Sequence, residues 1–227
     1  PLTTPPLTTT QARGTQAPVT TPDDAFLTTL SDTVNRLHST LTRFDQVSGD
    51  GDFGDNLAGG VRIARAARVP EGSANPGMLA AEEAFLDQVG GSSGPLFGLM
   101  FQQLRRALEA GGSTAEERVA AVRTGLRNAV EAVTRVGGAV PGDRTMIDPL
   151  AAAAAAAGSL GDVARAAVTN ARSTAELTPR RGRASYVGAR ALGTPDPGAV
   201  GAAIVVAVLA ATLDPTWDVD DLLGSWD

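Results

Sequence analysis

The feature that most constrains the fold is an apolar stripe near the start of the chain. Between residues 27 and 44 the apolar side chains recur alternately three and four positions apart, which places them on one face of an α-helix. They are Leu27, Leu30, Val34, Leu37, Leu41 and Phe44. A helix with such a face must bury it against other elements, and no alternating run of β-branched residues downstream demands a strand. The pattern therefore predicts an all-α domain.

Further helices are expected because glycine and proline separate a series of apolar segments. We place them near residues 55–67, 77–89, 95–110, 114–136, 145–157, 160–177 and 198–212, which gives eight helices in all. Thr21 can act as the N-cap of the first helix. The segment from Ser113 to Glu116 has the spacing of a capping box. Asp196 followed by Pro197 should begin the last helix.

Composition indicates how the chain divides into domains. Residues 1–20 are rich in threonine and proline, nearly uncharged and without periodicity, so we expect a flexible tail or linker there. Residues 21–227 should form one domain. Aromatic residues make up only 4% of the chain, so the core must consist largely of alanine, valine and leucine.

The charge and the missing residue types exclude several classes of function. A formal net charge of −6 argues against a nucleic-acid partner. No uninterrupted apolar stretch reaches about 18 residues, so we expect no membrane span. Cysteine is absent, which fits a reducing compartment such as the cytoplasm. All 19 basic residues are arginines, which excludes a Walker A loop, a protein-kinase lysine and Schiff-base chemistry.

The loop at residues 45–56, DQVSGDGDFGDN, crowds carboxylates together without a basic residue to compensate them. Asp45, Asp50 and Asp52 would form a hard-oxygen ligand set for Mg²⁺ or Ca²⁺, with Asp45 just past the end of the first helix. An EF-hand is excluded because neither possible register places Glu at the twelfth position. The alternative is a solvated turn, since aspartate and glycine are ordinary turn residues.

The segment GGSSG at residues 90–94 matches the G-x-S-x-G pattern of hydrolase nucleophile elbows. That motif needs a preceding strand and a following histidine, whereas a helix is expected here and the single histidine, His38, comes earlier. Phosphate binding by glycine backbone amides and the hydroxyls of Ser92 and Ser93 fits better. A plain glycine-rich connection between helices is the alternative.

Two other loops carry candidate binding residues. Arg180, Arg181 and Arg183 lie close together in the sequence and could neutralise phosphate oxygens, or they could form a solvated basic loop. Met146, in the segment GDRTMID, could line an apolar slot for a flat ring, although core packing is the ordinary role of a methionine.

Four strings in these loops together resemble the nucleotide-binding L subunit or domain of the dihydroxyacetone kinases. They are FDQVSGDGDFGDN, VGGSSGPLFG, PGDRTMID and GRASYVGARALGTPDPGA. They follow the family's order and spacing, and the resemblance covers the chain from about residue 22. It implies an eight-helix up-and-down antiparallel barrel, with the nucleotide site in the loops at one end.

The resemblance also implies a site. By this match Asp45, Asp50 and Asp52 hold two Mg²⁺ ions, and with Arg183 they form the catalytic set. The family's contacts to its adenine nucleotide, ATP or ADP, fall on Phe53, Gly54, Asp55, Asn56, Ser92, Ser93, Gly137, Met146, Arg183, Pro195, Asp196 and Pro197.

The implied reaction is phosphoryl transfer to dihydroxyacetone or a similar small hydroxy-ketone or sugar. In the family a separate K-type subunit or domain presents this triose, bound covalently to a histidine. His38 lies in a helix that does not match that role, so we expect a K-type partner. The donor would be free ATP or, as also occurs in the family, a phosphorylated carrier protein that recharges bound ADP.

Four positions depart from the family pattern. Phe53 replaces the histidine of GDGDHG, so an imidazole that could donate to phosphate is absent. Thr194 and Pro195 stand where the family has His-Gln, and Ala189 replaces a common glutamate. Two alternatives therefore stay open: a nucleotide-binding regulatory or scaffold protein without turnover, and a related kinase that acts on another metabolite.

Overall fold

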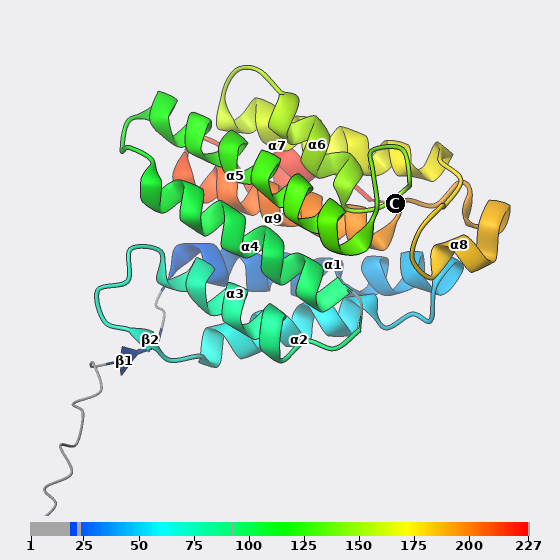
Figure 1. Ribbon diagram of the computed structural model, residues 1–227, viewed down its shortest axis with the longest axis horizontal. Coiled ribbons are helices and arrows are strands. Elements are labelled where there is room, and N and C mark those ends of the chain that lie inside the picture. Colours follow the sequence, from blue (N-terminus) through cyan, green and yellow to red (C-terminus); the bar gives the residue numbers. More distant parts are fainter. Residues whose placement is uncertain (1–18, 22–23, 92, 227) are drawn as a thin grey trace, which may run out of the picture.

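In a computed structural model, which describes residues 19–21, 24–91 and 93–226, the chain is built almost entirely of helices (Figure 1). The long ones are α1 (Ala25–Ser48), α2 (Phe53–Ala66), α3 (Pro76–Asp87), α4 (Ser93–Ala110), α5 (Ala115–Gly137), α6 (Ile147–Ala155), α7 (Leu160–Ser173) and α9 (Pro197–Leu213). Short elements lie between and after them: β1 (Val19–Thr20), β2 (Val69–Pro70), η1 (Thr174–Glu176), α8 (Ala184–Val187), η2 (Gly188–Ala191) and α10 (Val219–Leu223).

The long helices form an up-and-down barrel, which confirms the predicted fold class. Each packs against the next along the chain, and α9 packs against α1 to close the ring (Figure 1). Because successive helices alternate in direction, all connections lie at one of two ends. The connections after α1, α3, α5 and α7 share one end.

Helix α9 explains how the interior is filled. Every residue from 199 to 210 is buried, so this helix is apolar on all sides and contacts α1, α2, α6 and α7. Beside it, the Phe85 ring centroid lies 5.2 Å from that of Phe101 and 6.0 Å from that of Phe97. Within the described residues, no helix combines the length and the apolarity that crossing a membrane would require.

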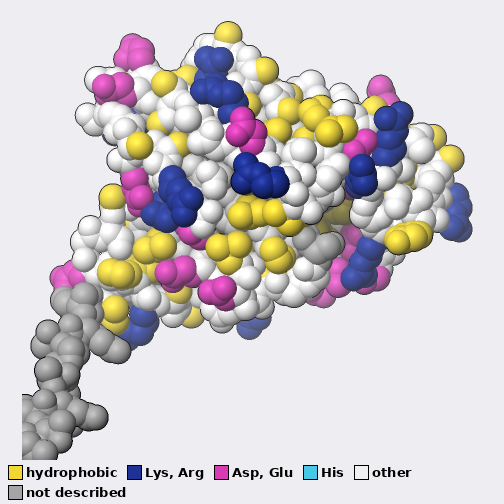
Figure 2. Space-filling view, viewed as in Figure 1, with side chains coloured by type: hydrophobic (Ala, Val, Ile, Leu, Met, Phe, Trp, Pro, Cys, Tyr) yellow, Lys and Arg dark blue, Asp and Glu magenta, His cyan; other side chains and the backbone are white. Residues whose placement is uncertain are grey.

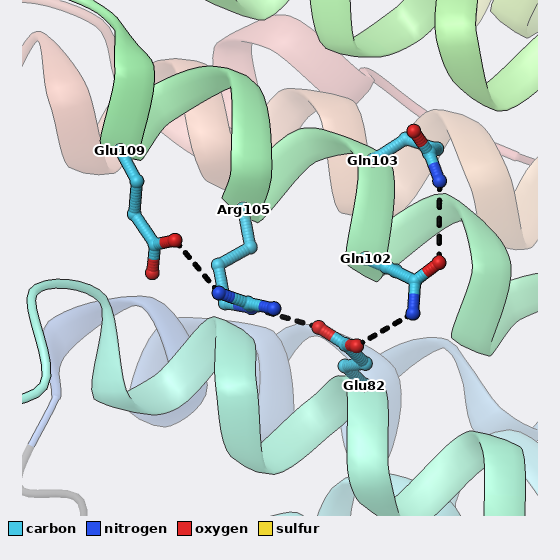
Figure 3. Close-up of polar contacts among 5 residues, drawn as sticks. All are labelled: Glu82, Gln102, Gln103, Arg105 and Glu109. Carbon is cyan, nitrogen blue, oxygen red and sulfur yellow. Dashed lines mark hydrogen bonds and ion pairs between the residues drawn. The ribbon is translucent and has the colours of Figure 1, made fainter.

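A buried polar network fixes α4 against α3 (Figure 3). Glu82 of α3 is only 7% exposed, and both of its carboxylate oxygens accept hydrogen bonds from α4. Arg105 Nε lies 2.7 Å from one oxygen and Gln102 Nε2 lies 2.8 Å from the other. Arg105 also contacts Glu109 at 2.7 Å. Because the buried carboxylate is satisfied by α4 alone, the network fixes the register of these two helices.

Two predicted helix starts are wrong. The N-cap of α1 is Asp24 rather than Thr21, because the Asp24 carboxylate accepts from two amides of its own helix and also from the amide of Gly77, 3.1 Å away at the start of α3. The capping box of α5 pairs Thr114 with Glu117 rather than Ser113 with Glu116. The sequence has the spacing of a capping box in both registers. Because the helix begins at Ala115, Glu117 occupies its third position and Thr114 is the N-cap. The start of α9 is confirmed: Asp196 caps it and Pro197 follows.

The predicted tail overlaps one described element. Residues 1–18 lie outside the described residues, whereas Val19 and Thr20 pair in antiparallel register with Pro70 and Val69. Helix α8, helix α10 and the two short strands were not expected from the sequence, because elements of two to five residues leave no periodic pattern.

Candidate functional site

One end of the barrel gathers most of the residues that the sequence singled out. It is the end at which α8 lies, on the right of Figure 1. Helices α2, α4, α6 and α9 begin there, so the positive ends of four helix dipoles face the same region. A cavity opens among the four connections, and Figure 2 shows dark blue arginine side chains beside magenta carboxylates around the hollow at this end.

The acidic cluster comes from the junction of α1 and α2. Asp45 lies inside the last turn of α1, not past its end as predicted, because α1 continues to Ser48. The carboxylate oxygens of Asp45, Asp50 and Asp52 lie within 4.8 Å of one another. Asp45 is buried, whereas the other two are exposed. Three carboxylates at this separation match the ligands that a hard divalent cation prefers.

Local backbone geometry positions the buried carboxylate. Asp45 Oδ2 accepts a hydrogen bond of 3.0 Å from the amide of Phe53, the first residue of α2. A Cβ atom at Gly49 would lie only 2.3 Å from Asp45 Oδ1, so a side chain there would displace the carboxylate. Gly51 has φ +83°, a conformation that favours glycine. The glycines of this loop therefore permit the aspartates to converge.

The basic residues of the loop before α9 lie on the rim of this cavity. Arg183 forms an ion pair with Asp50, and Arg181 Nε lies 3.6 Å from Asp143 Oδ2. Both arginine side chains are about half exposed. They bring positive charge to a cavity that the aspartates also line.

The apolar wall of the cavity is continuous with the protein core. Phe53 is 7% exposed, and its ring centroid lies 5.9 Å from that of Phe97. Met146 is 5% exposed, and with Leu96 it lines the same cavity. A flat apolar group therefore has a surface to pack on beside the polar groups.

Asp196 is the acid with the most perturbed ionisation. Burial raises the pKa of Asp196 to about 6, while the amide of Ala199 and the charge of Arg144 oppose this shift. Its Oδ2 accepts the Ala199 amide at 2.8 Å, the capping bond of α9. Burial in turn lowers the pKa of Arg144. At neutral pH Asp196 therefore adds a carboxylate to the cavity while still titrating near physiological pH.

Most predicted site residues share this cavity. Those that line it are Asp45, Asp50, Asp52, Phe53, Asn56, Ser93, Met146, Arg183, Asp196 and Pro197. Ser92 lies outside the described residues.

Four predicted contacts lie elsewhere. Gly54 is packed under α1, and Asp55 faces outward, where its carboxylate lies 2.8 Å from His38 Nε2. Gly137 ends α5 on the surface. Pro195 lines a neighbouring cavity with Trp226.

Sequence reasoning missed several lining residues. They are Ser48, Gly91, Leu96, Phe97, Arg144, Thr145, Arg181, Gly182, Ala184 and Gly198. Arg181 was singled out as a basic residue but not placed in the site. Arg144 belongs to the segment GDRTMID, whose unusual density of charge between two helices was the available signal.

Comparison with known proteins identifies the family. The DAK2 domain family model matches residues 47–211, which include two of the three clustered aspartates and the loops around the cavity. The chain belongs to the DAK2 domain family. This confirms the resemblance found in the sequence.

The relatives of this DAK2 domain include kinases and a kinase subunit. L-erythrulose 1-kinase of Mycolicibacterium smegmatis is 34% identical over 76% of this chain and 32% of its own length. The ADP-binding subunit DhaL of a PEP-dependent dihydroxyacetone kinase from Listeria innocua is 32% identical over 76% of this chain and 86% of its own length.

A solved structure also matches. The dihydroxyacetone kinase of C. freundii, crystallised in complex with AMP-PNP and Mg²⁺, aligns with a TM-score of 0.64 and 26% identity. The alignment covers 93% of this chain and 38% of the kinase. This DAK2 domain spans about a third of the length of the erythrulose kinases that it matches.

Proposed function

We propose that this DAK2 domain binds an adenine nucleotide through Mg²⁺ and forms the nucleotide half of a two-part kinase. The observation that carries the proposal is the convergence of Asp45, Asp50 and Asp52 in a cavity whose rim holds arginines. Crowded carboxylates repel one another by several kcal/mol at short range unless a cation lies between them. The complex of the C. freundii kinase with AMP-PNP and Mg²⁺ supports the same assignment.

The proposed metal ligands are the three aspartates, which would hold two Mg²⁺ ions against the nucleotide phosphates. Bound Mg²⁺ would neutralise phosphate charge and orient the transferred group. Ser93 at the start of α4 and Asn56 of α2 offer polar groups near helix N-termini, which favour phosphate. Of the other family-matched positions, we assign a phosphate contact also to Ser92, whereas Gly54 and Asp55 do not line the cavity and receive none.

The nucleotide base has a separate surface in this proposal. Met146 and Leu96 provide an apolar wall, and Gly137 lies at the adjoining end of α5. Asp196 and Pro197 lie at the start of α9, and Pro195 precedes them. We propose that this second group contacts the sugar and base, while Arg183 leaves Asp50 for a phosphate oxygen when Mg²⁺ takes its place.

The proposed acceptor is dihydroxyacetone or a similar small hydroxy-ketone or sugar, presented by a K-type subunit or domain. The names of the relatives support this class of substrate. The rim of the cavity supports docking, because large apolar side chains stand exposed around it. They are Val47 of α1, Val136 of α5, Val140 after α5, Tyr186 of α8 and Leu192 beside η2. Tyr186 is 90% exposed.

Thermal unfolding with Mg²⁺ and ADP tests the binding step. A ligand that binds only the folded state stabilises it by RT ln(1 + [L]/Kd), so the melting temperature should rise by several degrees when both are present. Asp50→Asn and Asp52→Asn should abolish this rise while the circular dichroism stays helical. Asp55→Asn is the matched control, since Asp55 belongs to the same segment but faces His38. No rise with any adenine nucleotide would contradict the proposal.

A regulatory protein without turnover is the second candidate. Phe53 favours it, because a buried phenyl ring stands where the family has an imidazole. An assay of triose phosphorylation, with and without a K-type partner, separates the two functions. The kinase predicts transfer only with the partner, using free ATP or a phosphorylated carrier protein as donor. Binding of Mg²⁺ and nucleotide without transfer to any tested triose, by any partner, would favour the regulatory function.

A further inference from the structure

Arg144 is the most deeply buried charged side chain at this end of the barrel. It is 1% exposed, and among the described residues it is the one non-glycine position with a left-handed backbone, at φ +62°. Such a conformation is costly for an arginine and persists only where the surroundings fix it. The described residues include no carboxylate within ion-pair distance of its guanidinium. Burying a charge without an ion-pair partner carries a large desolvation penalty.

What the guanidinium does instead is bind backbone carbonyls from one distant segment. Arg144 Nε donates to the carbonyl of Thr174 at 3.2 Å, and Nη2 donates to those of Ala191 and Thr194 at 3.1 and 2.8 Å. These acceptors lie near the two ends of the segment 174–196. A planar guanidinium can hold several acceptors in a fixed arrangement, which a lysine cannot do.

That segment carries much of the cavity rim. Arg183 and Asp196, which both line the cavity, lie within it. Hydrogen bonds within the segment join its two ends, because the amide of Gly193 donates to the carbonyl of Ala175 and the amide of Asp196 donates to Thr174 Oγ1. Asp143 contacts the middle of the segment: its carbonyl accepts from the amide of Arg180 at 3.2 Å, and its carboxylate pairs with Arg181. Glycines with positive φ lie at positions 182, 188 and 193 of the segment. Arg144 therefore joins both ends of this segment to the α5–α6 loop that carries Met146, whereas Asp143 contacts only its middle.

We propose that Arg144 is a positioning residue that holds the segment 174–196 against the α5–α6 loop and so builds the half of the site that binds the nucleotide. The metal-binding half does not depend on it, because the three clustered aspartates belong to α1 and to the α1–α2 connection. This inference rests on the proposed function for its affinity measurement. It predicts that substitution of Arg144 lowers the affinity for nucleotide but leaves the affinity for metal unchanged.

The test compares Arg144→Met and Arg144→Lys with the wild type. Arg144→Met should weaken Mg²⁺-dependent ADP binding by about tenfold or more, because several hydrogen bonds to a buried guanidinium are lost. Arg144→Lys keeps the charge but not the planar set of donors, so its ADP affinity should lie between those of the wild type and Arg144→Met. Binding of Mn²⁺ alone, followed by its paramagnetic resonance signal, should stay within about twofold of the wild type in both.

Arg105→Met is the control for a general loss of stability. It removes a largely buried guanidinium from the network between α3 and α4, away from the cavity, so it should lower the melting temperature without weakening ADP binding. ADP affinity that falls equally in Arg105→Met and Arg144→Met, for an equal loss of stability, would overturn the proposal. So would unchanged ADP affinity in Arg144→Met, or an equal loss of Mn²⁺ binding.

Hydrogen exchange without any ligand separates this inference from the proposed function. The amides of Gly193 and Asp196 should exchange at least about tenfold faster in Arg144→Lys, while those of α1 to α4 keep their wild-type rates. Unchanged exchange at these two amides would overturn the positioning role, even if nucleotide binds. Faster exchange in a protein whose wild type binds no nucleotide would support the positioning role and refute the proposed function instead. If Arg144→Met fails to fold, Arg144→Lys carries both measurements.

Discussion

Phe53→His reintroduces the side chain that the family usually carries at the start of α2, and the structure predicts that it destabilises this protein. The phenyl ring is 7% exposed, packs 5.9 Å from the Phe97 ring centroid and faces Gly201 of α9. A Cβ atom at Gly201 would lie 2.8 Å from the ring, so the site has no spare room. An imidazole in this place would bury ring nitrogens among apolar groups.

The expected cost follows from two contributions. Burying a phenylalanine side chain contributes about 1.5–3 kcal/mol, of which a histidine recovers only part. A buried polar group without a partner costs about 1–3 kcal/mol. Together they predict a loss of about 3 kcal/mol in the free energy of unfolding, or roughly 6–12 °C in melting temperature for a domain of this size. Phe53→Leu, which keeps an apolar side chain, should lose less.

The pH dependence of unfolding shows where the new imidazole lies. Among phenyl rings its folded-state pKa should fall below the unfolded value of about 6.5, so the folded state binds fewer protons and the variant loses further stability as the pH falls from 8 to 5.5. If the imidazole instead faced the aspartates, its pKa would rise and the variant would gain stability over that range. A gain at low pH, or a melting temperature equal to that of the wild type at pH 8, would refute the packing argument.

Three other substitutions have defined outcomes. Asp196→Asn keeps a capping oxygen on α9, and because burial raises the pKa of Asp196 to about 6, the carboxylate costs stability only once it ionises. The variant's free energy of unfolding, from urea titrations, should therefore rise relative to the wild type by about 2 kcal/mol between pH 4 and pH 7, and an unchanged difference would refute the raised pKa. Gly49→Ala places a Cβ atom 2.3 Å from Asp45 Oδ1 and should weaken Mn²⁺ binding while circular dichroism stays helical; wild-type affinity would show that the loop adapts. Gly201→Ala overpacks the interior against Phe53 and should lower the free energy of unfolding in urea by about 1–3 kcal/mol. An unchanged free energy of unfolding would show that the interior has room for the added methyl group.

The helices and the aspartate cluster could be predicted because both leave local patterns. Apolar spacing placed the long helices, and the crowding of Asp45, Asp50 and Asp52 in one short loop indicated that they converge. The exact helix ends could not be read in the same way. Asp24 rather than Thr21 caps α1 because its carboxylate also binds the amide of Gly77, a tertiary contact that no local pattern reports.

The direction of individual side chains could not be predicted from the sequence, because it too depends on tertiary contacts. Asp55 lies in the same acidic segment as the clustered aspartates, yet the first turn of α2 directs it outward to His38. Arg144 has its acceptors 30 to 50 residues further along the chain. Its importance depends on how the loop before α9 folds back, and only the three-dimensional structure shows this.

The barrel topology also explains why one end suits both a metal ion and a phosphate group. Helices that alternate in direction bring four N-termini and four C-termini to the same end. The N-termini favour anions, whereas Asp45 lies in the last turn of α1, where its negative charge meets the negative end of a helix dipole. That placement is unfavourable by about 0.3–1 kcal/mol in the absence of a cation. A bound cation makes the local charge positive, and its interaction with the helix dipole then becomes favourable. The position of Asp45 therefore makes part of the stability of α1 depend on a bound cation, which is why we expect metal and nucleotide together to raise the melting temperature.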